Sequence, residues 1–196
     1  MHKYLLKIKK LVVKSGFTLF ILRLPFRIIR YLLIKFNSYF WKHFLKECGR
    51  NVTIELGVHF ENPKNVIIKN NVYIGSNTIF GTELDEGYIV LEDNIHIGKN
   101  CKFDHTGNIH VGKYTLFSEN VKILSHTHGY DPRSKPLPKP LIIEDKCWFG
   151  INTIISENCN VIKTNTITAT SSVITKDILE QNTIYAGIPA KKIKSY

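Results

Sequence analysis

The sequence predicts a mainly β solenoid preceded by basic amphipathic helices. Two observations predict this arrangement: large apolar residues recur at every sixth position in the body of the chain, and all the excess positive charge lies before residue 47. The chain has 196 residues, of which 43% are hydrophobic, so it can bury one sizeable core. This composition excludes a disordered chain.

The six-residue rhythm is the main evidence for the solenoid. It runs through Ile68, Ile74 and Phe80, then Leu91, Ile97 and Phe103, then Val111, Phe117 and Ile123, and then Ile143, Phe149 and Ile155. Six residues make one short strand and one tight turn, so three units form a coil with a triangular cross-section. The six-residue spacing is irregular near 159–162, where either Val161 or Ile162 could point inward. We interpret this irregularity as a one-residue insertion.

The N-terminal arm carries the whole net charge of +11. Residues 1–46 hold eleven bases and no acid, whereas the sixteen bases that follow are balanced by sixteen acids. We expect three helices in the arm. The first covers 3–14 and has a basic stripe made of Lys3, Lys7, Lys10 and Lys14. The second covers 23–36 and has Pro25 in its first turn; its bases Arg23, Arg27 and Arg30 lie opposite the apolar Leu22, Phe26, Ile29 and Leu33. The third begins at Ser38.

A basic stripe beside an apolar face is typical of a helix that lies in the membrane interface. The alternative is that these apolar faces pack on the body or on a neighbouring subunit. The interleaved Leu, Ile and Phe favour lipid over nucleic acid as the partner. We expect neither a membrane-spanning helix nor a cleaved signal peptide. The four cysteines form no CxxC pair, which indicates reduced thiols in a cytosol.

Several strings carry a resemblance to a known family. NVYIGSN, NIHIGKN and the segment from CWFGINTII through VITKDI to NTIYAGIPAKKI resemble the hexapeptide-repeat O-acetyltransferases, of the maltose/galactoside acetyltransferase and surface-polysaccharide type. The resemblance covers about residues 50–194. It implies a left-handed parallel β-helix and a homotrimer with active sites between subunits. The expected domains are therefore a helical arm at 1–49 and an acyltransferase body at 50–196, with a C-terminal cap at 177–196.

Two breaks in the rhythm are the candidate sites of chemistry, because loops on a rigid scaffold often carry function. They are 104–108 and 125–140, and they hold His105, His126 and His128. A histidine in such a loop suits a general base. The resemblance implies that His126 deprotonates the acceptor hydroxyl, which attacks acetyl-CoA directly. His128, Asp104 and His105 are candidate substrate contacts.

The resemblance also implies acetyl-CoA as co-substrate and no metal. Its CoA positions match Trp148, Ile151, Thr170, Thr175, Lys176, Lys191 and Lys194. The sequence departs from the family where Ile151 replaces a small polar residue and where lysines replace arginines. Lysine neutralises phosphate but lacks the bidentate fork of arginine.

The expected function is transfer of an acetyl group to a sugar hydroxyl in capsule, exopolysaccharide or O-antigen synthesis. The acceptor is a sugar or a lipid-linked saccharide, and the enzyme is expected in the bacterial cytoplasm, peripheral on the inner face of the cell membrane. Alternatives are a non-catalytic β-helix scaffold and a serine or amino-sugar acetyltransferase. A zinc hydratase of the carbonic anhydrase kind is disfavoured, because only His105 and His110 form a suitable pair and a third histidine is missing.

Overall fold

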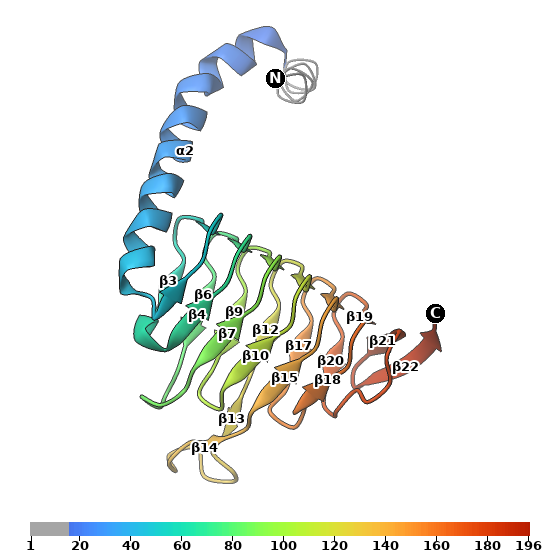
Figure 1. Ribbon diagram of the computed structural model, residues 1–196. Coiled ribbons are helices and arrows are strands. Elements are labelled where there is room, and N and C mark those ends of the chain that lie inside the picture. The colour runs from blue at the N-terminus through green and yellow to red at the C-terminus, as the bar shows by residue number, and fades with distance from the viewer. Residues whose placement is uncertain (1–15) are drawn as a thin grey trace.

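The computed structural model describes residues 16–196, which form one helix followed by a parallel β-solenoid (Figure 1). The expected helix at 3–14 lies outside the described residues. Each coil of the solenoid contributes one short strand to each of three sheets, and equivalent strands of successive coils pair in parallel.

The strands of the three sheets have the following bounds. The first sheet contains β1 (Glu47–Cys48), β4 (Val66–Ile68), β7 (Ile89–Leu91), β10 (Ile109–Val111), β15 (Leu141–Ile143) and β18 (Val161–Ile162). The second contains β2 (Thr53–Ile54), β5 (Tyr73–Ile74), β8 (His96–Ile97), β11 (Leu116–Phe117), β16 (Trp148–Phe149), β19 (Thr166–Thr168), β21 (Thr183–Gly187) and the antiparallel β22 (Ala190–Ser195). The third contains β3 (His59–Phe60), β6 (Ile79–Gly81), β9 (Lys102–Asp104), β12 (Lys122–Ile123), β17 (Ile154–Ile155) and β20 (Val173–Ile174).

The core is the stack of inward side chains that the rhythm predicts. All twelve residues named above for the rhythm are fully buried. Ile162 is also buried while Val161 is partly exposed, so the one-residue insertion before β18 is confirmed. Phe60, Phe80 and Phe103 stack with ring centroids about 5 Å apart.

Asparagine builds many of the corners. Asn51, Asn71 and Asn94 all have φ near +60° and stack at one corner, where each amide donates to the amide oxygen of the next coil. Asparagine tolerates this left-handed conformation better than most residues, which explains its frequency after residue 50.

The helical arm differs from the prediction. Residues 17–44 form a single helix, α2 (Phe17–Phe44), so Ser38 does not begin a new helix and Pro25 lies inside α2 rather than in a first turn. Ser38 instead lies in contact with the first coil: its Oγ donates to the Ile34 carbonyl and accepts from the Ile54 N–H. Its polar side chain therefore serves docking rather than capping. No helix in residues 16–196 is long and apolar enough to cross a membrane.

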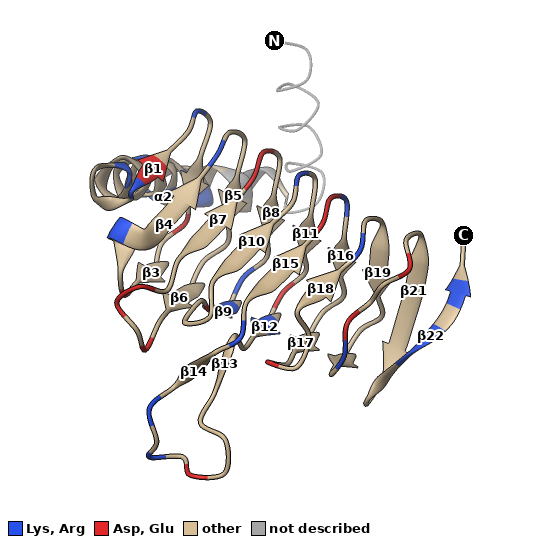
Figure 2. Ribbon diagram, turned by 60° about the horizontal axis from the view of Figure 1, so that its bottom comes forward, with Lys and Arg blue, Asp and Glu red and all other residues tan. Residues whose placement is uncertain are grey.

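A hairpin leaves the solenoid after the third sheet (Figure 2). Its strands are β13 (His126–Thr127) and β14 (Leu137–Pro138), which pair antiparallel and bring both ends of the loop at 125–140 together.

A short 3-10 helix, η1 (Pro63–Asn65), lies between the first two coils. The body shown in Figure 2 carries interspersed acids and bases, as its balanced composition requires.

Candidate active site

The base of the hairpin is fixed by a buried serine. Ser125 is fully buried; its Oγ donates to the Asp104 carbonyl and accepts from the Gly107 N–H. Its carbonyl accepts from the Lys139 N–H at the other end of the loop. These bonds tie the hairpin to the preceding coil, so the next residue, His126, has a defined position.

His126 and Asp104 form an imidazole–carboxylate pair. Nδ1 of His126 lies 2.6 Å from Oδ2 of Asp104, and the side chains are 12% and 9% exposed. Nδ1 has no other polar partner in residues 16–196, although its N–H is tilted from the line joining the two atoms. The other carboxylate oxygen accepts from the Thr106 hydroxyl and N–H, which holds Asp104 in place.

This pair has the chemistry of a general base. An ionised carboxylate only accepts hydrogen bonds, so it holds the imidazole proton on Nδ1 and leaves the Nε2 lone pair free. The same carboxylate stabilises the imidazolium that forms when Nε2 takes a proton. The structure therefore brings together His126 and Asp104, two residues that the sequence places in separate breaks.

Glu83 is a site residue that the sequence analysis missed. Its carboxylate lies 3.4 Å from Nε2 of His126 and 3.3 Å from Nε2 of His128. Its N–H donates to the Thr106 hydroxyl, which links it to the Asp104 network. Glu83 lies in a third break of the six-residue rhythm, between Phe80 and Leu91. These two residues are eleven positions apart, and this irregular spacing is the sequence signal that could have indicated the site.

His128 also belongs to the cluster, and its role as a substrate contact stays a prediction. Its ring lies 5.0 Å from that of His126, at 87°. Nδ1 of His128 donates to the Ser134 carbonyl, and the Ser134 hydroxyl donates back to the His128 carbonyl. The ring is therefore held from within its own loop.

His105 lies apart from the accessible cluster. It is fully buried, and its Nδ1 donates to the Gly87 carbonyl. Burial lowers the pKa of His105, so the ring is neutral at pH 7. His110 lies on the outer face of β10 beside Glu92, so these two histidines do not converge on a metal as the hydratase alternative requires.

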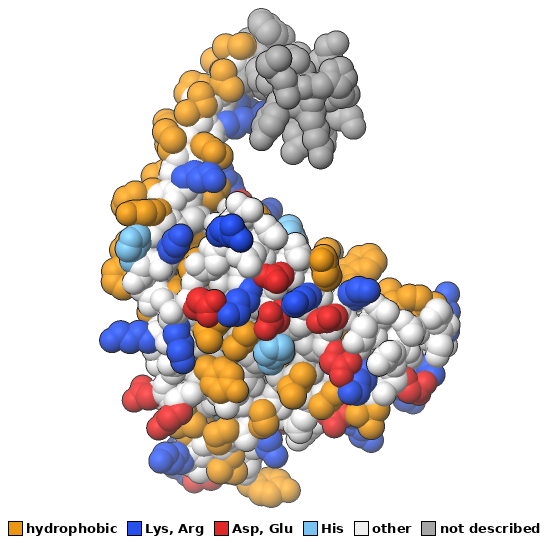
Figure 3. All heavy atoms as spheres, in the orientation of Figure 1, with side chains coloured by type: hydrophobic (Ala, Val, Ile, Leu, Met, Phe, Trp, Pro, Cys, Tyr) orange, Lys and Arg blue, Asp and Glu red, His pale blue; other side chains and the backbone are white. Residues whose placement is uncertain are grey.

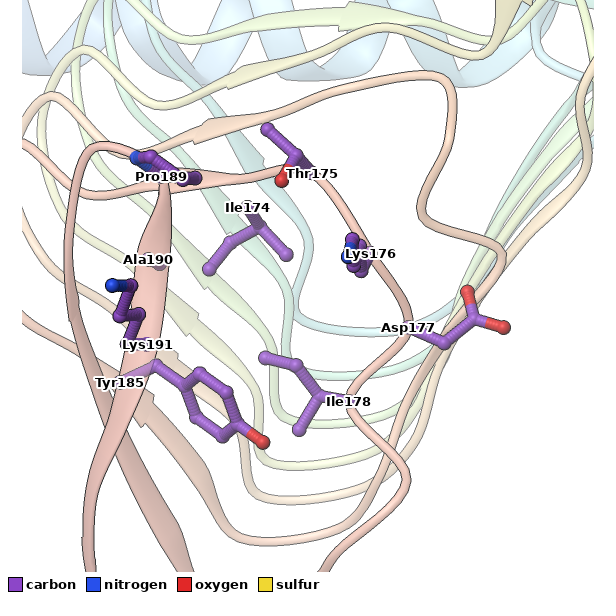
Figure 4. Close-up of a pocket in the computed structure, with 9 residues that line it drawn as sticks. All are labelled: Ile174, Thr175, Lys176, Asp177, Ile178, Tyr185, Pro189, Ala190 and Lys191. Atoms are coloured by element: carbon purple, nitrogen blue, oxygen red, sulfur yellow. The ribbon is translucent and has the colours of Figure 1, made fainter.

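Three of the predicted CoA residues line one pocket of about 280 Å³ (Figure 4): Thr175, Lys176 and Lys191. Tyr185 on β21, Ala190 on β22 and Pro189 in the turn between these strands face the 174–178 segment across it. The pocket lies along the same corner of the solenoid as the hairpin, two coils further on. Leu124 directly follows β12, Thr175 directly follows β20, and β17 pairs with both of these strands.

The other predicted CoA residues do not line this pocket. Trp148 is on the outer face of β16, where its Nε1 donates to the Ser118 hydroxyl. Ile151 and Thr170 lie at the corner between the second and third sheets, where the Ile151 carbonyl accepts from Ser171. Lys194 lies on β22, opposite Ile184.

A thiol nucleophile is not available at the described site. All four cysteines are free, and burial raises the pKa of Cys101 to about 11 and those of Cys147 and Cys159 to about 12. These three side chains are therefore protonated core residues.

Solved structures with the same architecture are known. AntD, an N-acyltransferase from Bacillus cereus solved with dTDP and 3-hydroxybutyryl-CoA, superposes with a TM-score of 0.71 at 19% identity, over 81% of this chain and 87% of AntD. The hexapeptide-repeat acetyltransferase VCA0836 from Vibrio cholerae superposes with a TM-score of 0.58 at 21% identity, over 96% and 92% of the two chains. The chain has the β-helix fold of these hexapeptide-repeat proteins. At these identities the structural likeness establishes the fold alone.

The sequence of this protein is also similar to named acetyltransferases. A protein of Escherichia coli K12 named as a lipopolysaccharide biosynthesis O-acetyl transferase, WbbJ, is 28% identical over 132 residues, covering 59% of this chain and 66% of WbbJ. The galactoside O-acetyltransferase of Lactococcus lactis is 29% identical over 106 residues, covering 49% and 50%. The matches thus span between half and two thirds of these relatives' length. The resemblance to acetyltransferases of this fold is confirmed. No protein-family model matches the chain.

Proposed function

We propose that this protein transfers an acetyl group from acetyl-CoA to a hydroxyl of a sugar, in the synthesis of a surface polysaccharide. The observation that carries the proposal is the Asp104–His126 pair at the base of a protruding hairpin. The names of the two sequence relatives support the acetyl group and the sugar acceptor. AntD was solved with an acyl-CoA and VCA0836 with acetyl-CoA, which supports the donor.

The reaction follows from the protonation state of His126. Nε2 of His126 removes the proton of the acceptor hydroxyl while its oxygen attacks the thioester carbonyl. The carbon–sulfur bond then breaks, and the imidazolium returns its proton to the leaving CoA thiolate. Asp104 stabilises the imidazolium between the two steps. Acetyl ester and free CoA are the products, and no covalent enzyme intermediate forms.

Acetyl-CoA would lie along the corner that joins the hairpin to the pocket in Figure 4. Lys176 and Lys191 line that pocket and would neutralise phosphate groups of CoA. Trp148, Ile151, Thr170 and Lys194 would contact CoA bound between subunits. Trp148 and Ile151 are 51% and 46% exposed in the single chain, which supports a homotrimer whose neighbouring subunit covers this apolar surface.

Thiol release from acetyl-CoA tests the proposed function, with a panel of acceptors that includes methyl glycosides, nucleotide sugars and lipid-linked saccharides. Replacement of His126 by alanine should lower turnover at least 100-fold. His110→Ala is the matched control, because His110 also lies beside a glutamate, Glu92, but is not part of the Glu83–His126–His128 cluster. Full thiol release by His126→Ala would refute the mechanism. Amino sugars in the panel distinguish N-acetyl transfer, and a chain that is inactive on all acceptors would favour the scaffold alternative.

We further propose that the arm holds the enzyme on an anionic membrane surface, peripheral on the cytoplasmic side. Seven large apolar residues lie at helical spacings of three and four along one face of α2, and all are exposed: Leu22, Phe26, Ile29, Leu33, Phe36, Phe40 and Phe44. Figure 3 shows hydrophobic side chains along the length of this helix. α2 contains five bases and no acid, which complements anionic lipid.

Vesicle flotation tests the membrane proposal. The double variant Phe26→Gln/Phe36→Gln removes the two most exposed members of the apolar face, at 74% and 69%, and should weaken binding to anionic vesicles at least tenfold. Tyr130→Gln is the matched control, since Tyr130 is a fully exposed aromatic at the hairpin tip. A double variant that floats like the wild type but changes in molecular mass would show that the face is a subunit contact, which refutes the membrane role.

A further inference from the structure

The two histidines of the hairpin have the same protonation pattern. Nδ1 of His126 lies 2.6 Å from the Asp104 carboxylate, and Nδ1 of His128 lies 2.6 Å from the Ser134 carbonyl. Both partners only accept hydrogen bonds and lie nearer than the Glu83 oxygens, at 3.3–3.4 Å from the Nε2 atoms, so the proton of each neutral ring is favoured on Nδ1. Each Nε2 therefore presents a lone pair.

Both lone pairs face a third electron-rich group. The Glu83 oxygens lie 3.4 Å from Nε2 of His126 and 3.3 Å from Nε2 of His128, and one ligand atom from each residue lies within 4.8 Å of the others. With both rings neutral, no proton lies between these three groups. A cation between these three groups, a proton or a metal ion, would relieve the repulsion among them.

The spacing matches the ligand shell of a tetrahedral metal ion. Zinc bonds of about 2.0–2.2 Å at tetrahedral angles place neighbouring ligand atoms about 3.3–3.5 Å apart. Oε1 of Glu83 lies 3.4 Å from Nε2 of His126 and Oε2 lies 3.3 Å from Nε2 of His128, so each carboxylate oxygen lies at this edge length from one ring, and small side-chain rotations would bring one oxygen to both. The Nδ1 contacts supply the outer shell, because metal-bound histidines almost always donate their second N–H to a carboxylate or a backbone carbonyl.

We propose that Glu83, His126 and His128 form a binding site for a divalent transition-metal ion of the zinc class, and that the bound ion inhibits acetyl transfer. Two imidazoles and one carboxylate are ligands that suit this class. The cluster is open to solvent, since Glu83 is 52% and His128 26% exposed. Inhibition follows because the Nε2 lone pair of His126 that would accept the acceptor's proton is donated to the metal. The transfer reaction itself requires no ion.

Cobalt and zinc titrations of the full-length, EDTA-treated and dialysed protein test the site. Co²⁺ should bind once per chain and give the strong visible absorption of tetrahedral cobalt, and Zn²⁺ should displace it. Glu83→Gln and His128→Asn should each weaken binding at least tenfold. Glu86→Gln changes an exposed acid in the same loop, and His110→Asn changes another histidine that lies 3.3 Å from a glutamate; both should bind as the wild type does.

Absence of saturable Co²⁺ or Zn²⁺ binding would overturn the proposal, as would wild-type affinity in both ligand variants. Thermal unfolding of each variant verifies that a loss of binding is not a loss of fold. The inhibition rests on the proposed function: Zn²⁺ should suppress thiol release in the wild type at its binding concentration and at least tenfold less effectively in His128→Asn. Because metal binding is measured without acetyl-CoA, a failure of the metal site and a failure of the transferase function are distinguishable.

Discussion

At the scale of single residues, two histidines of neighbouring coils have opposite roles because their surroundings differ. His105 is fully buried and its pKa is lowered, chiefly because burial disfavours the charged ring. His126 lies one coil further along the corner, between two carboxylates at the surface. His105 is therefore a core residue, whereas His126 is suited to proton transfer.

The lowered pKa of His105 makes stability depend on pH. The unfolded chain takes up a proton near pH 6.5 that the folded chain binds only at lower pH, so stability is complete above that pH and falls as the pH decreases. His105→Gln should flatten this dependence when urea unfolding is compared at pH 7.5 and 5.5. Burial also lowers the pKa of His96, and this changes stability with pH in the same direction in the wild type and in His105→Gln. An identical pH slope in wild type and variant would contradict the prediction.

Asp104→Asn should lower kcat about 100-fold or more while leaving KM for acetyl-CoA nearly unchanged. The amide can still accept from Thr106, but its NH₂ would face Nδ1 of His126, and this favours the tautomer with the proton on Nε2. Initial rates of thiol release measure both constants. Asp85→Asn, an exposed acid of the Glu83 loop, is the control, and a near-normal kcat for Asp104→Asn would exclude the pair as the base.

The sequence predicts His126 and Asp104 but not their contact. His126 is found because it opens a loop that interrupts a regular rhythm, and the family resemblance supports it. Glu83 is missed although its interval, from Phe80 to Leu91, also interrupts the rhythm. That interval contains no histidine, the residue type on which the prediction of the site was based. The pairing of coils, which brings residues about twenty positions apart together, converts these separate breaks into one site.

At the scale of elements, the hairpin depends on a glycine beneath it. A Cβ at Gly107 would lie 1.9 Å from the Ser125 carbonyl oxygen and 2.3 Å from the Lys139 nitrogen, the two atoms that close the base of the hairpin. Only a residue without a side chain lets the strands of the hairpin leave the solenoid at this point.

Gly107→Ala should therefore displace the hairpin, lower acetyl transfer at least tenfold and cost about 1–3 kcal/mol of stability through overpacking. Thiol release and urea unfolding measure the two effects. Gly129→Ala, in the same loop, is the control for activity, because a Cβ there would have no neighbour within 4 Å; its φ of +65° strains alanine, so this variant does not serve as a control for stability. Equal activity in the two variants would show that the base of the hairpin does not position His126.

The elements also differ in how well the sequence predicts them. The strands follow directly from the rhythm, because every inward position must hold an apolar side chain and the corners need turn residues. The arm does not follow from the sequence in this way, since Pro25 and Ser38 are ordinary boundary signals and α2 continues through both. At Ser38, tertiary contacts override the signal. Ser38 and Asn37 bond the backbone of Ile54 and Glu55 in the first coil, and these bonds hold α2 continuous through Ser38.

At the scale of the whole molecule, the described arm joins the body through the second half of α2, from the ion pair between Arg30 and Glu55 to Leu45. Trp41 packs edge-on against Phe60 with centroids 4.9 Å apart, and Leu45 is 7% exposed. In Figure 1 the helix then extends beyond the first coil. The basic, apolar arm and the neutral body thus meet at the first coil, which α2 covers.

Two truncations distinguish these parts. Deletion of residues 1–29 keeps Arg30, Asn37, Ser38, Trp41 and Leu45, so the contacts with the first coil remain. This variant should keep its unfolding temperature and its turnover on soluble acceptors while binding anionic vesicles more weakly. Deletion of residues 1–45 removes Trp41 and Leu45 and exposes Phe60, so it should also unfold at a lower temperature, because about 1.5–3 kcal/mol of burial is lost per large apolar side chain. Differential scanning calorimetry and vesicle flotation measure the two effects. Equal unfolding temperatures would show that α2 does not stabilise the solenoid, whereas undiminished flotation of the shorter deletion would place any membrane contact after residue 29.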